Sequence, residues 1–372
     1  MRDMSLTPGV HREWPLPRGL IILIGAASAV LVVAGLRSAS GIVGPVFLAL
    51  VLTVAVYPLR RYPVKHGWPA WSGTLVGIVA VYVLLLGLSA AMVVAAARFA
   101  TLLPQYQSDF NDLVQDGAAK LKDYGVGQSE IDSVSNSFDA SQFVTAAENV
   151  LGNLLSLVSN LFFIVTLLLF LGIDATHFPE KLNANRAERP AVVMALESFA
   201  DGTRRYLVVS TVFGLIVAVL DTTFLAFTPI PAPLVWGLLA FITNYIPNVG
   251  FVIGLVPPAI LGLLEGGPEL MVLVIVVYSV LNFLIQSVIQ PKVVGDAVGL
   301  SSSLTFVSLI FWAWVLGPVG ALLAVPLSLL AKALLVDVDK DAMWLKHLLG
   351  SGPVVPEPDH ETATPDTRPA AL

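Results

Sequence analysis

The sequence predicts an all-α polytopic membrane protein, and composition and charge spacing support this. Of the 372 residues, 56% are apolar and only 12% are charged, whereas ordinary soluble domains carry about 25% charged residues. The charged residues are also unevenly spread. They leave several uncharged runs long enough for the roughly 20-residue helix that crosses a bilayer. A soluble core could not bury this much apolar surface, so lipid must be the solvent for most of the chain.

The residues that are missing exclude several classes of enzyme. There is no Cys, hence no disulfide framework, no Cys-ligated zinc and no thiol catalysis. No Lys follows a Gly, so a Gly-Lys-Ser/Thr phosphate loop and direct use of ATP are excluded, and no His-Glu-x-x-His pair is present. The net charge of −6 and the scattered basic residues argue against nucleic acid. We therefore expect no enzyme, no catalytic residue, no cofactor and no metal site.

The uncharged runs divide the chain into seven regions. The expected order is a cytoplasmic tail at 1–17, helices 1–3 at 18–98, an extracytoplasmic helical segment at 99–150, helix 4 at 151–173, a cytoplasmic linker at 174–205, a transport core at 206–335 and an acidic, Pro-rich cytoplasmic tail at 336–372. Basic residues in short loops indicate the cytoplasmic side. Arg60, Arg61 and Lys65 follow the second run, whereas segment 99–150 carries eight acids and two lysines. Both termini should therefore be cytoplasmic.

Two runs in the transport core, 232–264 and 303–335, are too long for one crossing. A helix of that length would reach about 50 Å, against about 30 Å of hydrocarbon. Both runs contain Gly and Pro near their middle. The interruptions are NYIPNVG at 244–250, Pro257-Pro258, Gly317-Pro318 and Gly320. We therefore predict six full spans and two broken hairpins, either re-entrant or fully spanning.

The two hairpins share a short pattern. Segments 247–257 and 318–326 both read Pro, Val-Gly, an apolar run and Val-Pro. Paired Gly/Pro-interrupted segments indicate the binding site of a transporter built from an inverted repeat, although Gly and Pro are common in membrane helices generally. The candidate residues for hairpin backbone and substrate path are Asn244, Tyr245, Pro247, Asn248, Gly250, Pro291, Gly295, Gly317, Pro318, Gly320 and Pro326. Asn244 and Asn248 could equally satisfy backbone groups freed by the prolines.

Asp221 is the one ionisable residue inside the predicted span 206–228. Ser210, Gly214 and Ala218 precede it by eleven, seven and three residues, so a small, polar helix face should turn Asp221 into the bundle. A carboxylate at that depth costs at least ~2.5–3.5 kcal/mol and usually marks function. We expect Asp221 to bind a proton or a cation such as sodium. An acid protonated at rest or wetted at the outer surface is the alternative.

A second polar stripe occupies the span 270–290. Ser279, Asn282, Gln286 and Gln290 recur at i, i+3, i+7 and i+11, which places them on one face of an α-helix. The stripe could line a path for a small polar solute. Alternatively, it could join helices, with each side chain contributing about 0.6 kcal/mol.

Three segments resemble the autoinducer-2 exporter family of bacterial inner-membrane proteins: NYIPNVGFVIGLVP at 244–257, IQPKVVGDAVGL at 289–300 and LGPVGALLAVPL at 316–327. The resemblance covers about residues 18–336. It implies a homo-oligomeric permease that exports the quorum-sensing signal autoinducer-2, as attributed to some members, or exchanges sodium for protons, as attributed to others. Many members have Glu where this chain has Gln290.

Together these patterns predict a secondary transporter that exports a small polar solute, with autoinducer-2 as the named candidate. Asp221 would be the coupling site for protons or sodium, and Asn282, Gln286 and Gln290 would line the path. A sodium/proton antiporter centred on Asp221 is the first alternative. A non-transporting membrane scaffold, whose outer segment binds a partner in the cell envelope, is the second.

Overall fold

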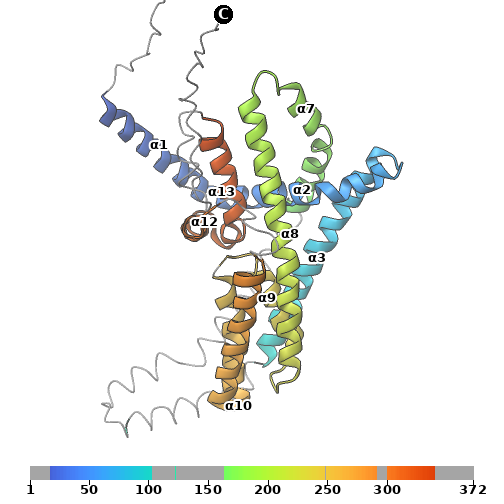
Figure 1. Cartoon of the computed structure of the whole chain (residues 1–372), viewed down its shortest axis with the longest axis vertical. Helices are drawn as coiled ribbons and strands as arrows, with labels where there is room; N and C mark the ends of the chain where they lie inside the picture. The colour runs from blue at the N-terminus through green and yellow to red at the C-terminus, as the bar shows by residue number, and fades with distance from the viewer. Residues whose placement is uncertain (1–16, 103–121, 123–162, 248, 291–299, 340–372) are drawn as a thin grey trace, which may run out of the picture.

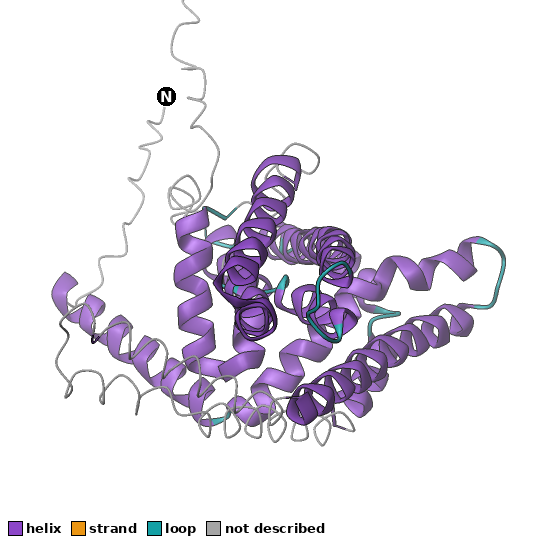
Figure 2. Cartoon of the chain, turned by 90° about the horizontal axis from the view of Figure 1, so that it is seen from below, coloured by secondary structure: helices purple, strands orange, loops and turns teal. Residues whose placement is uncertain are grey.

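The computed structural model describes residues 17–102, 122, 163–247, 249–290 and 300–339. Within these ranges the chain is helical and forms no strand, as Figures 1 and 2 show. Five helices there are long and apolar enough to cross a membrane, or six if the bent pair Phe163–Asp174 and Phe178–Ala184 counts as one span. The predicted class of multi-pass helical membrane protein is confirmed.

Three helices occupy most of residues 18–102, where the predicted range was 18–98. They are α1 (Arg18–Ser38), α2 (Ser40–Lys65) and α3 (Ala70–Leu102). None of the described side chains of α1 is buried, and the helix touches only the edge of the bundle, at α2 and α12. Leu, Ile and Val side chains exposed along α1 are stable only against lipid or another protein.

The linker predicted at 174–205 is largely helical. A short helix, α7 (Phe178–Ala184), is followed by α8 (Pro190–Ala226), which runs for 37 residues or about 55 Å. Pro190 lies in the first turn, where its missing N–H is not needed, and no proline interrupts the rest. Phe199 is buried against Val325 and Leu329. The first half of α8 is therefore packed core and not a loop.

After α8, the described residues of the predicted transport core form six helical segments. They are α9 (Pro233–Thr243), α10 (Gly250–Asn282), the π-helix η2 (Phe283–Ile289), α12 (Ser302–Leu322), α13 (Ala324–Lys332) and the π-helix η3 (Ala333–Asp337). In Figure 1, α13 lies beside the first half of α8, and α9 and α10 lie beside its second half. The long helix α8 thus connects the two parts of the molecule.

The breaks at 244–249 and Gly317 are as predicted, but the one at Pro257-Pro258 is wrong. Both prolines lie inside α10, because a membrane bundle re-satisfies the carbonyls that a proline frees. The chain turns instead at Gly267, where φ is 73°. Gly317, with φ of 68°, makes the equivalent turn in α12. A positive φ is accessible to glycine but leaves the α-helix, so each turn is made by a Gly that precedes a Pro.

The shared pattern of the two hairpins does not give the same structure. Segment 247–257 begins in a break and leads into the long helix α10. Segment 318–326 also begins at a break, but its helix ends at Leu322 and a new one starts at Ala324. Gly320 is not a break at all: a Cβ there would lie 1.9 Å from the carbonyl oxygen of Trp312, so its lack of a side chain allows close packing.

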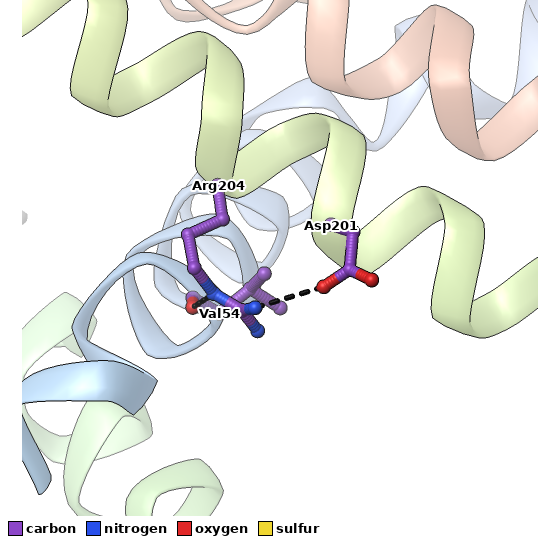
Figure 3. A network of polar contacts seen from close by, with 3 residues as sticks. All are labelled: Val54, Asp201 and Arg204. Carbon is purple, nitrogen blue, oxygen red and sulfur yellow. Dashed lines mark hydrogen bonds and ion pairs between the residues drawn. The ribbon is translucent and has the colours of Figure 1, made fainter. Parts of the chain in front are cut away.

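A hydrogen bond from a charged side chain of α8 to the backbone of α2 joins these two helices. Pro58 has no N–H for the carbonyl of Val54, four residues earlier in α2. Arg204 on α8 donates from Nε to that oxygen at 3.4 Å and from Nη1 to Asp201 at 2.9 Å, as Figure 3 shows. Its guanidinium also lies 5.4 Å from the Tyr57 ring. The proline in α2 thus creates an acceptor that α8 uses.

Candidate functional site

Asp221 is buried in the second half of α8, with 2% of its surface exposed. Ser210, Gly214 and Ala218 are buried on the same helix, so the predicted inward face is the face that the structure buries. Within the part of the chain that the structure describes, the Asp221 Oδ1 atom has no hydrogen-bond partner. A carboxylate held this way in an apolar bundle is costly while charged, and binding a proton or a small cation lowers that cost.

Four of the predicted site residues come together around one cavity. Asp221 from α8, Asn244 from the break after α9, Asn282 from the end of α10 and Gln286 from η2 all line it. Tyr278 is a fifth lining residue, and its buried hydroxyl also lacks a partner. The cavity is about 10 Å³, which is room for one water molecule. It suits a proton, a water or a small cation, and it is too small for an organic solute.

A chain of hydrogen bonds crosses the site. Gln286 donates from Nε2 to the Asn244 Oδ1 at 2.7 Å, and Asn244 donates from Nδ2 to the Ser210 carbonyl at 3.0 Å. Gly214 makes this possible, since a Cβ there would lie 2.7 Å from the Asn244 Nδ2 atom. One amide therefore connects α8, the break after α9 and the π-helix η2.

The break itself is held by tyrosines. Tyr206 on α8 donates to the backbone carbonyl of Tyr245 at 2.7 Å, and the Tyr245 hydroxyl lies 2.7 Å from the Thr211 Oγ1. Pro247 accepts a backbone hydrogen bond in the turn. Gly250 starts α10, and a Cβ there would lie 1.8 Å from the Thr243 carbonyl oxygen. These contacts satisfy a non-helical backbone that lipid could not.

The predicted stripe on the helix 270–290 only partly reaches the cavity. Asn282 and Gln286 line it, whereas Ser279 and Gln290 do not. The π-helical turn η2 adds a residue per turn and rotates the residues after it relative to their positions in an α-helix. Tyr278 lines the cavity instead of Ser279. It lies four residues before Asn282 and eight before Gln286, and this helical spacing is the signal that could have found it.

The second hairpin lies elsewhere. Gly317, Pro318, Gly320 and Pro326 do not line the cavity around Asp221. Their helices pack through Val315, Leu316, Leu323 and Leu327 against Val51 on α2. Asn248, Pro291 and Gly295 fall outside the described residues, as do most of segment 99–150 and the tail beyond 339. Among the described residues, no three His, Cys, Asp or Glu side chains come close enough together to hold a metal ion.

Comparison with known proteins decides the family. The model of the AI-2E family transporter matches residues 20–339, which include the whole cavity. The chain belongs to the AI-2E transporter family. It is 31% identical to the AI-2 transport protein TqsA of Escherichia coli strain K12, over 84% of this chain and 91% of TqsA. It is 27% identical to YhhT of the same strain, over 91% of this chain and 97% of YhhT.

Membership confirms the resemblance drawn from the three sequence motifs. AI-2E proteins are transport proteins and not enzymes, so this family member is a membrane transporter. The substrate is named for TqsA, whereas the name of YhhT includes none.

Proposed function

We propose that this AI-2E transporter moves a small polar solute out of the cell, with autoinducer-2 as the first candidate, and that Asp221 couples this movement to protons. The observation that carries the proposal is the buried Asp221 carboxylate, whose Oδ1 has no partner and which faces a cavity shared with Asn244, Asn282 and Gln286. The name of the relative TqsA supports the choice of solute.

The size of the cavity separates coupling from solute binding. Room for one water molecule accommodates a proton carried by the carboxylate but not a solute of several heavy atoms. The solute must therefore pass when α9 or η2 moves. Such a movement would separate Gln286 from Asn244, whose 2.7 Å hydrogen bond joins these two elements beside Asp221. Protonation of Asp221 and opening of the solute path would then both involve Asn244 and Gln286.

Sodium/proton exchange at Asp221 is the second candidate. The amide side chains of Asn282 and Gln286 line the cavity together with Asp221, and amide oxygens are suitable ligands for a hard cation. A single carboxylate and room for one water favour the proton over a hydrated sodium ion.

Proteoliposomes distinguish these possibilities. Purified protein is reconstituted with autoinducer-2 inside, and efflux is measured with and without an imposed pH gradient or sodium gradient. We expect pH-driven efflux that Asp221→Asn abolishes and that Glu269→Gln, at an exposed acid after the Gly267 turn, preserves. Efflux that depends neither on the gradients nor on Asp221 would refute the coupling of solute movement to protons. Sodium-dependent proton flux without solute would favour the antiporter, and no flux of any kind would favour a scaffold.

The membrane orientation is part of the proposal. We expect a bacterial inner-membrane protein with both termini in the cytoplasm. Because the chain has no Cys, single cysteines report topology without background. A cysteine at Ser5 should be shielded from an impermeant maleimide in whole spheroplasts, and one at Ser108 should react. The opposite pattern would reverse the orientation. Light scattering of the purified protein tests the homo-oligomer that the family resemblance implies.

A further inference from the structure

Arg60 is a buried charge that the proposed transport mechanism does not use. It lies in the last part of α2, with 9% of its surface exposed. Its Nη2 donates to the Thr74 Oγ1 on α3 at 3.1 Å. Its Nε and Nη1 atoms are buried and have no hydrogen-bond partner among the described residues. Arginine stays protonated in proteins, so the positive charge itself is buried.

The chain is shaped to bury this side chain. Gly73 and Gly77 on α3 face Arg60, and a Cβ at either would clash: 2.2 Å from the Arg60 carbonyl oxygen at Gly73, and 2.5 Å from its Cγ at Gly77. The two glycines are four residues apart, the spacing that lets membrane helices approach closely. The aliphatic part of Arg60 lies in the space they leave.

Arg60 lines a cavity of about 20 Å³, together with residues that include Thr53, Thr74 and Gly172. Every lining residue other than Arg60 is uncharged. Gly172 lies near the C-terminal end of the helix Phe163–Asp174, whose dipole offers about half a negative charge. That offsets only part of a full positive charge. A buried cation without a counter-charge is strongly unfavourable, so this site favours the binding of an anion.

Neighbouring aromatic residues indicate the depth of the site. Tyr62, Trp68 and Trp71, which follow Arg60 on α2, the turn and α3, are all more than 60% exposed. Exposed Tyr and Trp side chains concentrate at the level of the lipid headgroups. We infer that the Arg60 guanidinium binds a phosphate oxygen of a membrane lipid. The cavity beside Arg60 has room for a single oxygen atom, and hydrogen bonds from arginine to phosphate are charge-assisted and strong.

Full-length protein in dodecyl maltoside, stripped of lipid, provides the test. Dioleoylphosphatidylglycerol is added, and bound lipid is counted by native mass spectrometry while thermal unfolding is followed. Dioleoylglycerol has the same chains without the phosphate. We expect the phospholipid to bind and to raise the unfolding temperature, and the diacylglycerol to do neither. Arg60→Gln should weaken binding about tenfold or more, as loss of a charge-assisted hydrogen bond does. Lys65→Gln, which removes an exposed charge at the end of the same helix, should not.

Three results would overturn the inference. The first is equal binding of dioleoylglycerol, and the second is phospholipid binding that Arg60→Gln leaves unchanged. The third is stabilisation by chloride or inorganic phosphate without stabilisation by the lipid, which would assign the site to a free anion. If Arg60→Gln does not fold, Arg60→Lys keeps the charge and loses the planar guanidinium. Phospholipid affinity that falls severalfold in Arg60→Lys supports a bound phosphate, and unchanged affinity refutes it.

Discussion

Replacing Gly214 with Ala tests whether the hydrogen-bond chain at the candidate site depends on close contact between α8 and Asn244. The added Cβ would lie 2.7 Å from the Asn244 Nδ2 atom and 3.2 Å from its Cβ. Since the Asn244 backbone follows the end of α9, its side chain must turn away. Asn244 then loses its bond to the Ser210 carbonyl and the one it accepts from Gln286.

The expected cost follows from these contacts. Two hydrogen bonds within a membrane bundle contribute about 0.6 kcal/mol each, and overpacking costs about 1–3 kcal/mol. Ala regains up to about 1 kcal/mol of helix propensity over Gly. Gly214→Ala should therefore lower the free energy of unfolding by about 1–3 kcal/mol. Gly25→Ala in α1, where an added Cβ meets nothing within 4 Å, should be neutral or stabilising.

Unfolding by dodecyl sulfate in mixed micelles measures both variants, and proteoliposome efflux is measured in parallel. A double-mutant cycle with Asn244→Ala isolates the contact, because shortening Asn244 makes room for the new methyl group. Gly214→Ala should then cost much less than it does alone. Equal stability of Gly214→Ala and Gly25→Ala, or the same cost in both backgrounds, would refute the reasoning.

Three further substitutions test other parts of the structure. Arg204→Gln should lower the free energy of unfolding by up to about 1 kcal/mol. The loss should be smaller in a Pro58→Ala background, because the Val54 carbonyl then regains a helical N–H partner. Equal losses in both backgrounds would mean that the contact between Arg204 and Val54 in Figure 3 contributes nothing. Gly317→Ala should cost about 1–3 kcal/mol, because φ is 68° there; an unchanged unfolding midpoint would contradict the turn. Tyr278→Phe removes a buried hydroxyl that has no partner among the described residues, so the free energy of unfolding should stay the same or rise, while efflux should fall. Unchanged efflux would mean that the Tyr278 hydroxyl has no role in transport.

Hydrophobicity and charge spacing were enough to predict much of this molecule. Lipid must surround an apolar helix whose backbone is internally satisfied, so the long uncharged runs predicted three helices in the region where α1, α2 and α3 lie. The burial of Asp221 was predictable for the same reason. A lone carboxylate in a membrane span is stable only when its helix face points into the bundle, and small residues at helical spacing mark that face.

Tertiary contacts determined what the sequence could not show. Pro257-Pro258 looked like a break, but the bundle keeps α10 helical there and turns at Gly267. Arg60 was interpreted as one of three loop charges, yet two glycines on a different helix bury it. Residues three or four positions apart on one helix can be recognised in the sequence by their spacing. Residues that another helix contributes to the same cavity cannot.

Two residues of the candidate site lie where the backbone departs from a regular α-helix. Asn244 lies in a break after α9, and Gln286 lies in a turn wider than an α-helix. Both positions carry backbone with fewer regular hydrogen bonds, and a π-helical turn or a break moves at lower cost than a continuous helix does. Asp221 lies opposite them on the uninterrupted helix α8. A change of charge on Asp221 should therefore act first on the two elements most able to move, which is the arrangement that the proposed coupling needs.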